Sequence, residues 1–120
     1  MAIQFSESIG GKTVVVRVSG KLSHEDFLQF VPEFEEAARR IGKFRVLFVM
    51  DDFHGWETDA VWDEIKFDLK HVTDIERMAM VGDKKWEKNL TAFCKPFSTA
   101  KIRYFDQTAA VEAQAWLEQP

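Results

Sequence analysis

Residues 44–50, Phe-Arg-Val-Leu-Phe-Val-Met, decide the fold of this chain. The run is almost continuously apolar, which is typical of a strand that is covered on both faces in the middle of a parallel sheet. A helical pattern over residues 58–72 and a second β-type run over residues 75–81 follow it. Strands that alternate with helices of about ten or more residues predict a parallel sheet with right-handed crossovers.

The segment before this central strand predicts a hairpin and a helix. Two β-type runs, over residues 3–7 and 13–19, flank Gly10-Gly11, and glycine tolerates the positive φ that a hairpin turn requires. Residues 23–26, Ser-His-Glu-Asp, have the form of a capping box, which predicts the start of a helix. Pro32 lies inside that helix, so we expect a kink there or a second helix that begins at Pro32.

The segment after the central strands predicts two more helices and an edge strand. Residues 86–97 carry apolar side chains at helical spacing. Residues 101–105 alternate charged and apolar side chains, as at a sheet edge where charge discourages further pairing. Asp106 or Thr108 is expected to cap a last helix. The sequence therefore predicts an α/β fold with a single mixed, mostly parallel five-stranded sheet, an N-terminal β-hairpin and about four helices.

Length and composition bound the class of protein. The 120 residues fit one domain over residues 1–120, because separate cores usually need roughly 100 residues each. A content of 46% hydrophobic and 30% charged residues excludes a disordered chain. The net charge of −4 argues against nucleic acid as a partner, since phosphate binding requires a basic excess. A single cysteine, Cys94, excludes an internal disulfide, and the lack of a leader or transmembrane pattern predicts a cytoplasmic protein.

Several segments together resemble the SpoIIAA-like proteins. They are residues 20–27 (Gly-Lys-Leu-Ser-His-Glu-Asp-Phe), 52–56 (Asp-Phe-His-Gly-Trp), 67–71 (Phe-Asp-Leu-Lys-His), 81–86 (Val-Gly-Asp-Lys-Lys-Trp) and 103–106 (Arg-Tyr-Phe-Asp). These are small bacterial proteins related in fold to STAS domains, with a broader likeness to the lipid-binding CRAL-TRIO fold. The resemblance covers nearly the whole chain and implies a fold more than a function.

The best-understood STAS relatives are anti-sigma-factor antagonists, which are switched by phosphorylation of a serine at the start of the helix after the central strand. The corresponding residues 51–59 contain no serine, and Thr58 lies between Glu57 and Asp59. These acids would repel an added phosphate. We therefore do not carry the phosphorylation switch over to this chain.

Acidic residues follow three of the expected strands. They are Asp51, Asp52, Asp83 and Asp106. Because the carboxyl ends of parallel strands share one edge, these carboxylates could converge on Mg²⁺ in a metal-dependent, phosphate-handling enzyme. The simpler interpretation, which we favour, is that each aspartate caps a helix or shapes a loop. His24, His54 and His71 lack metal-site spacing, and no common hydrolase, NTPase or dinucleotide motif is present. We expect no catalytic residue and no cofactor.

Lysines form a stripe on the expected third helix. Lys84, Lys88 and Lys95 lie roughly opposite Trp86 at 100° per residue. Such a stripe could contact an anionic membrane surface or an acidic partner. The ordinary interpretation is the solvated face of a domain helix.

Aromatic residues are abundant, and some fall outside the expected core positions. Aromatic side chains make up 13% of the chain. The residues of interest are Phe53 and Trp56 in the expected loop after the central strand, Phe67 off its helix stripe, and Phe27, Phe30 and Phe34 on the first helix. They could line an apolar pocket or form an exposed patch, or they could simply plug the core.

These observations favour a non-enzymatic binding or regulatory module. Its aromatic surface or pocket would hold a protein partner, a second copy of the chain as a homodimer, or an apolar, lipid-like small ligand. The metal-dependent enzyme built on the aspartates is the alternative.

Overall fold

The elements follow one another in the order expected from the sequence. A computed structural model describes residues 3–7, 12–58, 60–61, 63–64, 75–94 and 100–119. Its elements are β1 (Ile3–Glu7), β2 (Thr13–Leu22), α1 (His24–Ile41), β3 (Phe44–Trp56), β4 (Ile75–Gly82), α3 (Lys85–Cys94), β5 (Lys101–Asp106), the short 3-10 helix η2 (Gln107–Ala109) and α4 (Ala110–Glu118). The expected Gly10-Gly11 turn, and most of the helix expected over residues 58–72, lie outside the described residues.

The five strands form one mixed sheet, as predicted. Their order is β1-β2-β3-β4-β5, so each strand pairs with the next along the chain. β1 is antiparallel to β2, and β2 to β5 are parallel to one another. Three α-helices have bounds within the described residues, and residues 60–61 and 63–64, in the helix expected over residues 58–72, are helical as well; about four helices were expected. The apolar run that begins at Phe44 lies in the central strand β3, which confirms its predicted place.

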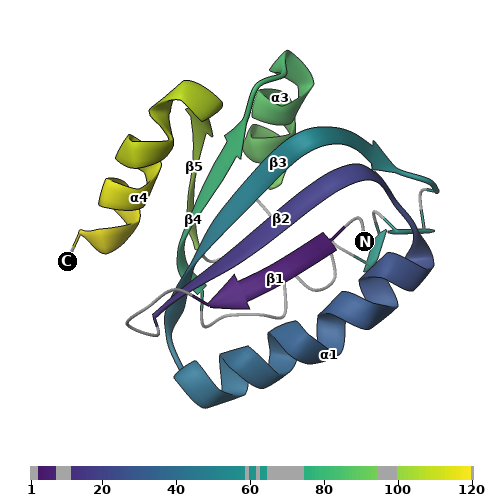
Figure 1. Ribbon diagram of the computed structural model, residues 1–120, viewed down its shortest axis with the longest axis horizontal. Coiled ribbons are helices and arrows are strands. Elements are labelled where there is room, and N and C mark those ends of the chain that lie inside the picture. The colour runs from purple at the N-terminus through teal and green to yellow at the C-terminus, as the bar shows by residue number, and fades with distance from the viewer. Residues whose placement is uncertain are drawn as a thin grey trace.

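The two faces of the sheet carry cores of different size. The larger core contains Val16, Val46 and Met78, and α1 contributes Phe30 and Phe34 to it while α3 contributes Leu90. The smaller core lies on the other face, where Ala113 and Leu117 of α4 pack against strand residues that include Ala79, Val81 and Phe105. Figure 1 shows α1 along one side of the sheet, with α4 standing beside β4 and β5.

Helix α1 starts where the sequence predicts but continues through its proline. Ser23 Oγ accepts from the Asp26 backbone N–H at 3.1 Å, and Asp26 Oδ2 accepts from the Ser23 backbone N–H at 3.0 Å, which completes the capping box. Pro32 lies inside one unbroken helix, so the alternative of two helices is wrong. Pro32 is exposed, and water can therefore solvate the backbone carbonyl that the proline leaves without a donor.

Strand β3 is longer than the apolar run that predicts it. It continues to Trp56 because β2 pairs with it beyond the run, at Gly20↔Phe53 and Leu22↔Trp56, across two irregularities of register. Asp52 adopts a positive φ of 51° within this stretch, a conformation that aspartate tolerates better than most residues. The expected loop over residues 51–56 is therefore wrong, since these residues are strand.

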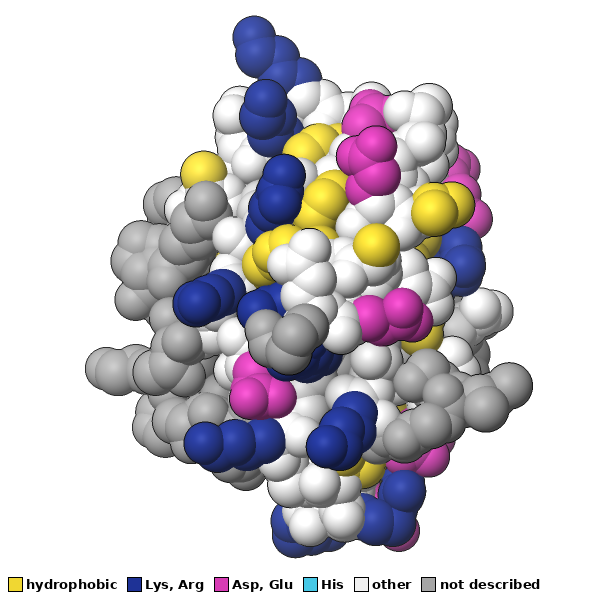
Figure 2. Space-filling model, turned by 90° about the vertical axis from the view of Figure 1, so that its left-hand side faces the viewer, with side chains coloured by type: hydrophobic (Ala, Val, Ile, Leu, Met, Phe, Trp, Pro, Cys, Tyr) yellow, Lys and Arg dark blue, Asp and Glu magenta, His cyan; other side chains and the backbone are white. Residues whose placement is uncertain are grey.

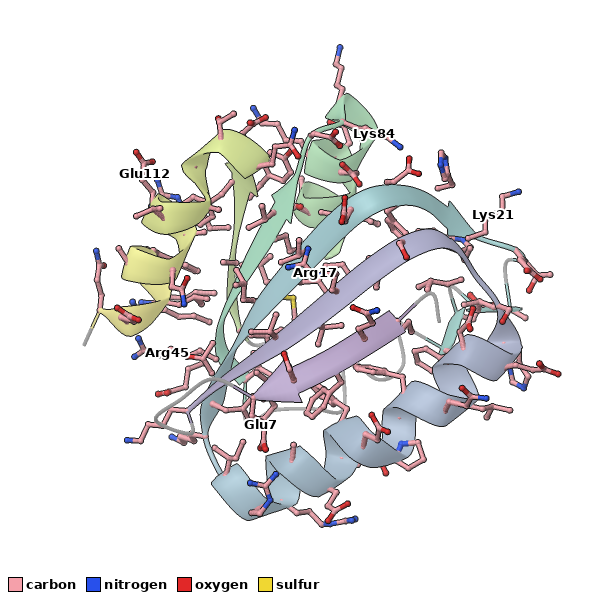
Figure 3. The ribbon with its side chains drawn as sticks, viewed as in Figure 1. Glu7, Arg17, Lys21, Arg45, Lys84 and Glu112 are labelled. Atoms are coloured by element: carbon pink, nitrogen blue, oxygen red, sulfur yellow. The ribbon has the colours of Figure 1, made fainter. Side chains whose placement is uncertain are left out.

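Two arginines on neighbouring strands hold the end of α4. Arg45 donates to the backbone carbonyls of Leu117 and Gln119. Arg77, opposite Arg45 in the β3–β4 register, donates to the carbonyls of Trp116 at 2.7 Å and Gln119 at 3.2 Å. Cations are favourable at a helix C-terminus because the last carbonyls carry partial negative charge. This anchor fixes α4 against the sheet, and Figure 3 shows Arg45 below the end of that helix.

Candidate functional site

The carboxyl ends of β3, β4 and β5 bring the predicted aspartates to one edge of the sheet, where the carboxylates of Asp51, Asp52 and Asp106 each have their own partner. Asp51 Oδ2 lies 3.7 Å from Arg17 Nη1. Asp52 Oδ1 lies 3.2 Å from His54 Nε2 and 3.9 Å from Lys84 Nζ. The four aspartates are all exposed.

The remaining two aspartates have helix-related roles. Asp106 Oδ1 accepts from the backbone N–H of Thr108 at 3.0 Å and from its hydroxyl at 2.9 Å, which caps η2. The backbone and side-chain hydrogen bonds from Thr108 lower the pKa of Asp106 below its ordinary value. Asp83 contributes its backbone N–H, rather than its carboxylate, to the start of α3. Among the described residues, no three His, Cys, Asp or Glu side chains gather so as to hold a metal ion.

A buried glutamate that the sequence analysis missed organises the turn between β4 and α3. Glu87 is fully buried, and its Oε1 accepts from the backbone N–H groups of Asp83 at 3.0 Å and Lys84 at 2.9 Å. Among the described residues, its Oε2 has no hydrogen-bond partner. A Cβ at Gly82 would lie 2.6 Å from Glu87 Oε1, so the glycine leaves room for the carboxylate. Glutamate at the third position of a helix is half of a capping box, and that signal could have found Glu87.

The pKa of Tyr104 in β5 is affected by the negative charges at this edge. The side chain is half-buried, and burial raises the pKa of Tyr104 above its ordinary value of 10.0, with further contributions from the negative charges of Asp106, Glu87 and Asp83. Both effects disfavour a phenolate there.

The predicted aromatic residues divide between the core and the edge. Phe53 is 1% exposed and Phe27 is 9% exposed, so both are core residues. Phe30 and Phe34 are half-buried and pack with their rings 5.3 Å apart. Trp56 is half-buried at the end of β3, and Phe67 lies outside the described residues.

This arrangement corrects the expected position of Phe53. The residue is not in a loop and is 1% exposed, because β3 continues past it. The register irregularity and the positive φ of Asp52 break the alternation after Met50 and turn the Phe53 ring into the larger core. The pairs Phe5–Phe34 and Phe34–Phe44, with centroids 6.4 Å and 5.6 Å apart, show how α1 uses its aromatics to pack on the sheet.

The lysine stripe is interrupted at its first member. Lys84 Nζ donates to the backbone carbonyl of Phe53 at 3.1 Å and so reaches across to β3. Lys88 is exposed on α3, while Lys95 and the Trp86 side chain lie outside the described residues. Lys84 therefore belongs to the sheet edge, and Figure 3 shows it at the start of α3, above the end of the sheet.

The end of β3 is an accessible part of this edge. Pairing with β4 ends at Val49↔Val81, whereas β2 stays paired to Trp56. We call residues 51–56 the β3 extension. The side chains of Asp51, Asp52 and His54 are 69%, 82% and 55% exposed, and Lys84 braces the backbone at Phe53. The β3 extension is therefore an exposed surface on a fixed backbone.

Comparison with known proteins finds a matching family model and solved structures of similar fold. A family model described as SpoIIAA-like matches residues 13–118. An uncharacterized protein of the DUF3478 family with a SpoIIAA-like fold, from Shewanella loihica PV-4, is 27% identical over 97% of this chain and 92% of that one, with a TM-score of 0.78. The anti-sigma factor antagonist SpoIIAA in its unphosphorylated form is 15% identical over 95% of this chain and 98% of that one, with a TM-score of 0.62. No curated protein sequence matches the chain significantly.

The described residues also include no helix that is long and apolar enough to cross a membrane.

Proposed function

The chain belongs to the SpoIIAA-like family, and from this membership we propose that it is a non-enzymatic regulatory module that binds a protein partner through the β3 extension. The fold is shared with an anti-sigma factor antagonist, a protein defined by its action on another protein. A single cysteine, Cys94, suits a reducing compartment, and we propose that the module works in the cytoplasm.

One observation carries the choice of surface. The β3 extension holds its exposed charged side chains on a backbone that is braced from both sides, by β2 through strand pairing and by Lys84 through the Phe53 carbonyl. A surface that is ordered before binding loses less conformational entropy when a partner docks. Trp56, half-buried beside these charges, supplies the kind of aromatic anchor that is enriched at interfaces.

A protein partner fits the observations better than an apolar small ligand. A ligand pocket would use accessible aromatic rings, but Phe27 and Phe53 are buried in the core. Phe30 and Phe34 pack against the sheet. The exposed side chains of the β3 extension are charged or polar, as at the rim of a protein interface.

Site-specific photo-cross-linking in cells tests the proposal. A photoreactive residue at His54 should form an adduct with one discrete protein, whereas the same residue at Lys43, which is exposed at the opposite edge, should not. The mass of the adduct identifies the captured protein and separates it from a second copy of the chain.

Two further substitutions make the test specific. Asp52→Asn removes a charge but keeps a side chain that tolerates positive φ, and Lys84→Ala removes the brace on β3. Both should weaken the adduct at His54 without unfolding the chain. Equal adducts at His54 and Lys43, or an adduct that survives both substitutions unchanged, would contradict the proposal.

A further inference from the structure

Within the described part of the chain, no helix covers one portion of a sheet face. Because the parallel strands follow in sequential order, right-handed crossovers bring their connecting helices to the same face. α1 and α3 both pack on the larger core. The opposite face is covered by α4, over β3, β4 and β5. Figure 1 shows no described helix in front of β1, β2 and the adjoining part of β3.

We call this uncovered surface the open face. By strand alternation, it carries the side chains that point away from Val16 and Val46. They are Gln4, Ser6, Val15, Arg17, Val49 and Asp51. Val15 and Val49 are half-buried, and the others are exposed. Figure 3 shows Arg17 on this side. Parallel strands such as β2 and β3 are normally covered on both faces, so an open face here is unusual.

The outer side of α4 is also exposed among the residues that the structure describes. Val111 is 84% exposed, and it and Leu28 are the large hydrophobic residues that the described part of the chain exposes. Ala110 and Ala115 beside it are exposed as well. Figure 2 shows hydrophobic side chains gathered over the α4 side of the molecule, between basic and acidic ones.

We propose that the open face and α4 form a symmetric homodimer, in which α4 of each copy covers the open face of the other. A two-fold axis makes this contact twice, so one arrangement covers both unpartnered surfaces. A second copy is the occupant we favour because this one chain carries both halves of the contact.

The dimensions of the two surfaces match. Three strands spaced about 4.8 Å apart give a face about 10 Å wide between the axes of its outer strands, close to the roughly 10 Å diameter of a helix with its side chains. α4 has nine residues and is therefore about 13 Å long, shorter than the ten-residue strand β2 at about 33 Å. The helix thus fits within the open face.

One pair of opposite charges can meet across the contact. α4 carries two charged residues, Glu112 and Glu118, and both are exposed acids. The open face presents one base and one acid, Arg17 and Asp51, whose side chains are 48% and 69% exposed. The ion pair between them has a long separation of 3.7 Å in a solvent-exposed setting, where such pairs contribute little. Arg17 can therefore turn to Glu112 of a second copy.

Sedimentation equilibrium over a wide range of concentration tests the proposal. The wild-type mass should rise to that of two chains. Val111→Glu should weaken the association at least about tenfold, which is about 1.4 kcal/mol, because it places a charge in the contact. Leu28→Glu makes the same change at the other exposed large hydrophobic residue and should associate like the wild type.

A charge exchange tests the orientation. Arg17→Glu should weaken the dimer, and Arg17→Glu combined with Glu112→Arg should restore it. Circular dichroism should show that all variants fold, since each site is exposed. A wild-type chain that stays monomeric throughout, a Val111→Glu chain that dimerises like the wild type, or an exchange that restores nothing would overturn the proposal. Adducts of a different protein at His54 would leave the proposed regulatory function standing in any of these cases.

Discussion

At the scale of single residues, Tyr104 reports on the carboxyl edge because the chain contains one tyrosine. Burial, and then the charges of Asp106, Glu87 and Asp83, raise its pKa above 10.0. A raised pKa in the folded state stabilises the fold below the unfolded pKa, and this contribution is lost as the pH rises through the folded pKa. Ultraviolet absorbance should therefore show Tyr104 ionising above pH 10.0 in the folded chain, and at lower pH once urea unfolds it.

Asp106→Asn serves as the control for that titration. It removes one of the charges that face Tyr104 but leaves burial, the larger cause, in place. The midpoint should fall in this variant yet stay above that of the unfolded chain. A folded midpoint at or below the unfolded one would show that neither burial nor the carboxylates act on Tyr104.

Sequence reasoning found residues whose roles are local and missed those whose roles depend on tertiary packing. The capping pair Ser23 and Asp26 was predictable because two residues three positions apart define the motif. The place of Phe53 was not, because it depends on how far β2 extends the pairing of β3. For Glu87 the sequence contained only half of a capping box. Its complete burial depends on the space that Gly82 leaves for the carboxylate, and Gly82 lies outside the helix.

At the scale of elements, α4 depends on the strands that hold its end. Arg77→Met removes two hydrogen bonds to the last carbonyls of α4 and a favourable charge at the helix C-terminus. We expect it to lower the free energy of unfolding by about 1–2 kcal/mol. Urea denaturation measures the change.

Lys101→Met is the matched control for that substitution. Lys101 lies opposite Arg77 in the β4–β5 register and is exposed, so the variant loses the same charge from the neighbouring strand. Its free energy of unfolding should change by less than about 0.5 kcal/mol. Equal losses in the two variants would mean that the net charge, and not the hold on α4, explains the effect.

The strands and helices were predictable wherever hydrophobic spacing alone sets them. The run at residues 44–50 indicated a central strand, and the alternation of charged and apolar residues over residues 101–105 indicated an edge strand; both predictions are confirmed. The ends of β2 and β3 were not predictable. They contain the polar residues Lys21, Asp52 and His54, which lie outside any apolar run, and they are strand only because β2 and β3 pair with each other there.

At the scale of the whole molecule, the two cores differ in size, and this difference predicts unequal stability. α4 packs on the smaller core, whereas β2 and β3 pack in the larger one. Elements with less buried apolar contact open more readily than the rest of a domain. Native-state hydrogen exchange of the monomeric chain should show amides of α4 at least about tenfold less protected than those of β2 and β3.

Urea sharpens that measurement. The opening of α4 should respond weakly to low urea because it exposes little surface, whereas the opening of β2 and β3 should respond as steeply as global unfolding. Protection of α4 equal to that of the central strands would show that the domain opens only as one unit.

The class of fold was predictable from the alternation of elements, and the family model over residues 13–118 agrees with the resemblance carried by the short motifs. The site was less predictable, because exposure at a sheet edge is set by the whole architecture. Val111 illustrates this, since its outward direction on α4 depends on which side of that helix meets Ala79 and Phe105.

The sequential strand order has a consequence for co-translational folding on the ribosome. Every strand pairs with the one made just before it, so a nascent chain can add each new strand to the rim of a sheet that already exists. Each strand therefore pairs with a partner that is close in sequence, which keeps loop closures short. It also limits the time during which aggregation-prone edge strands are exposed. α4 emerges after all five strands, so it can pack against a sheet that is already complete.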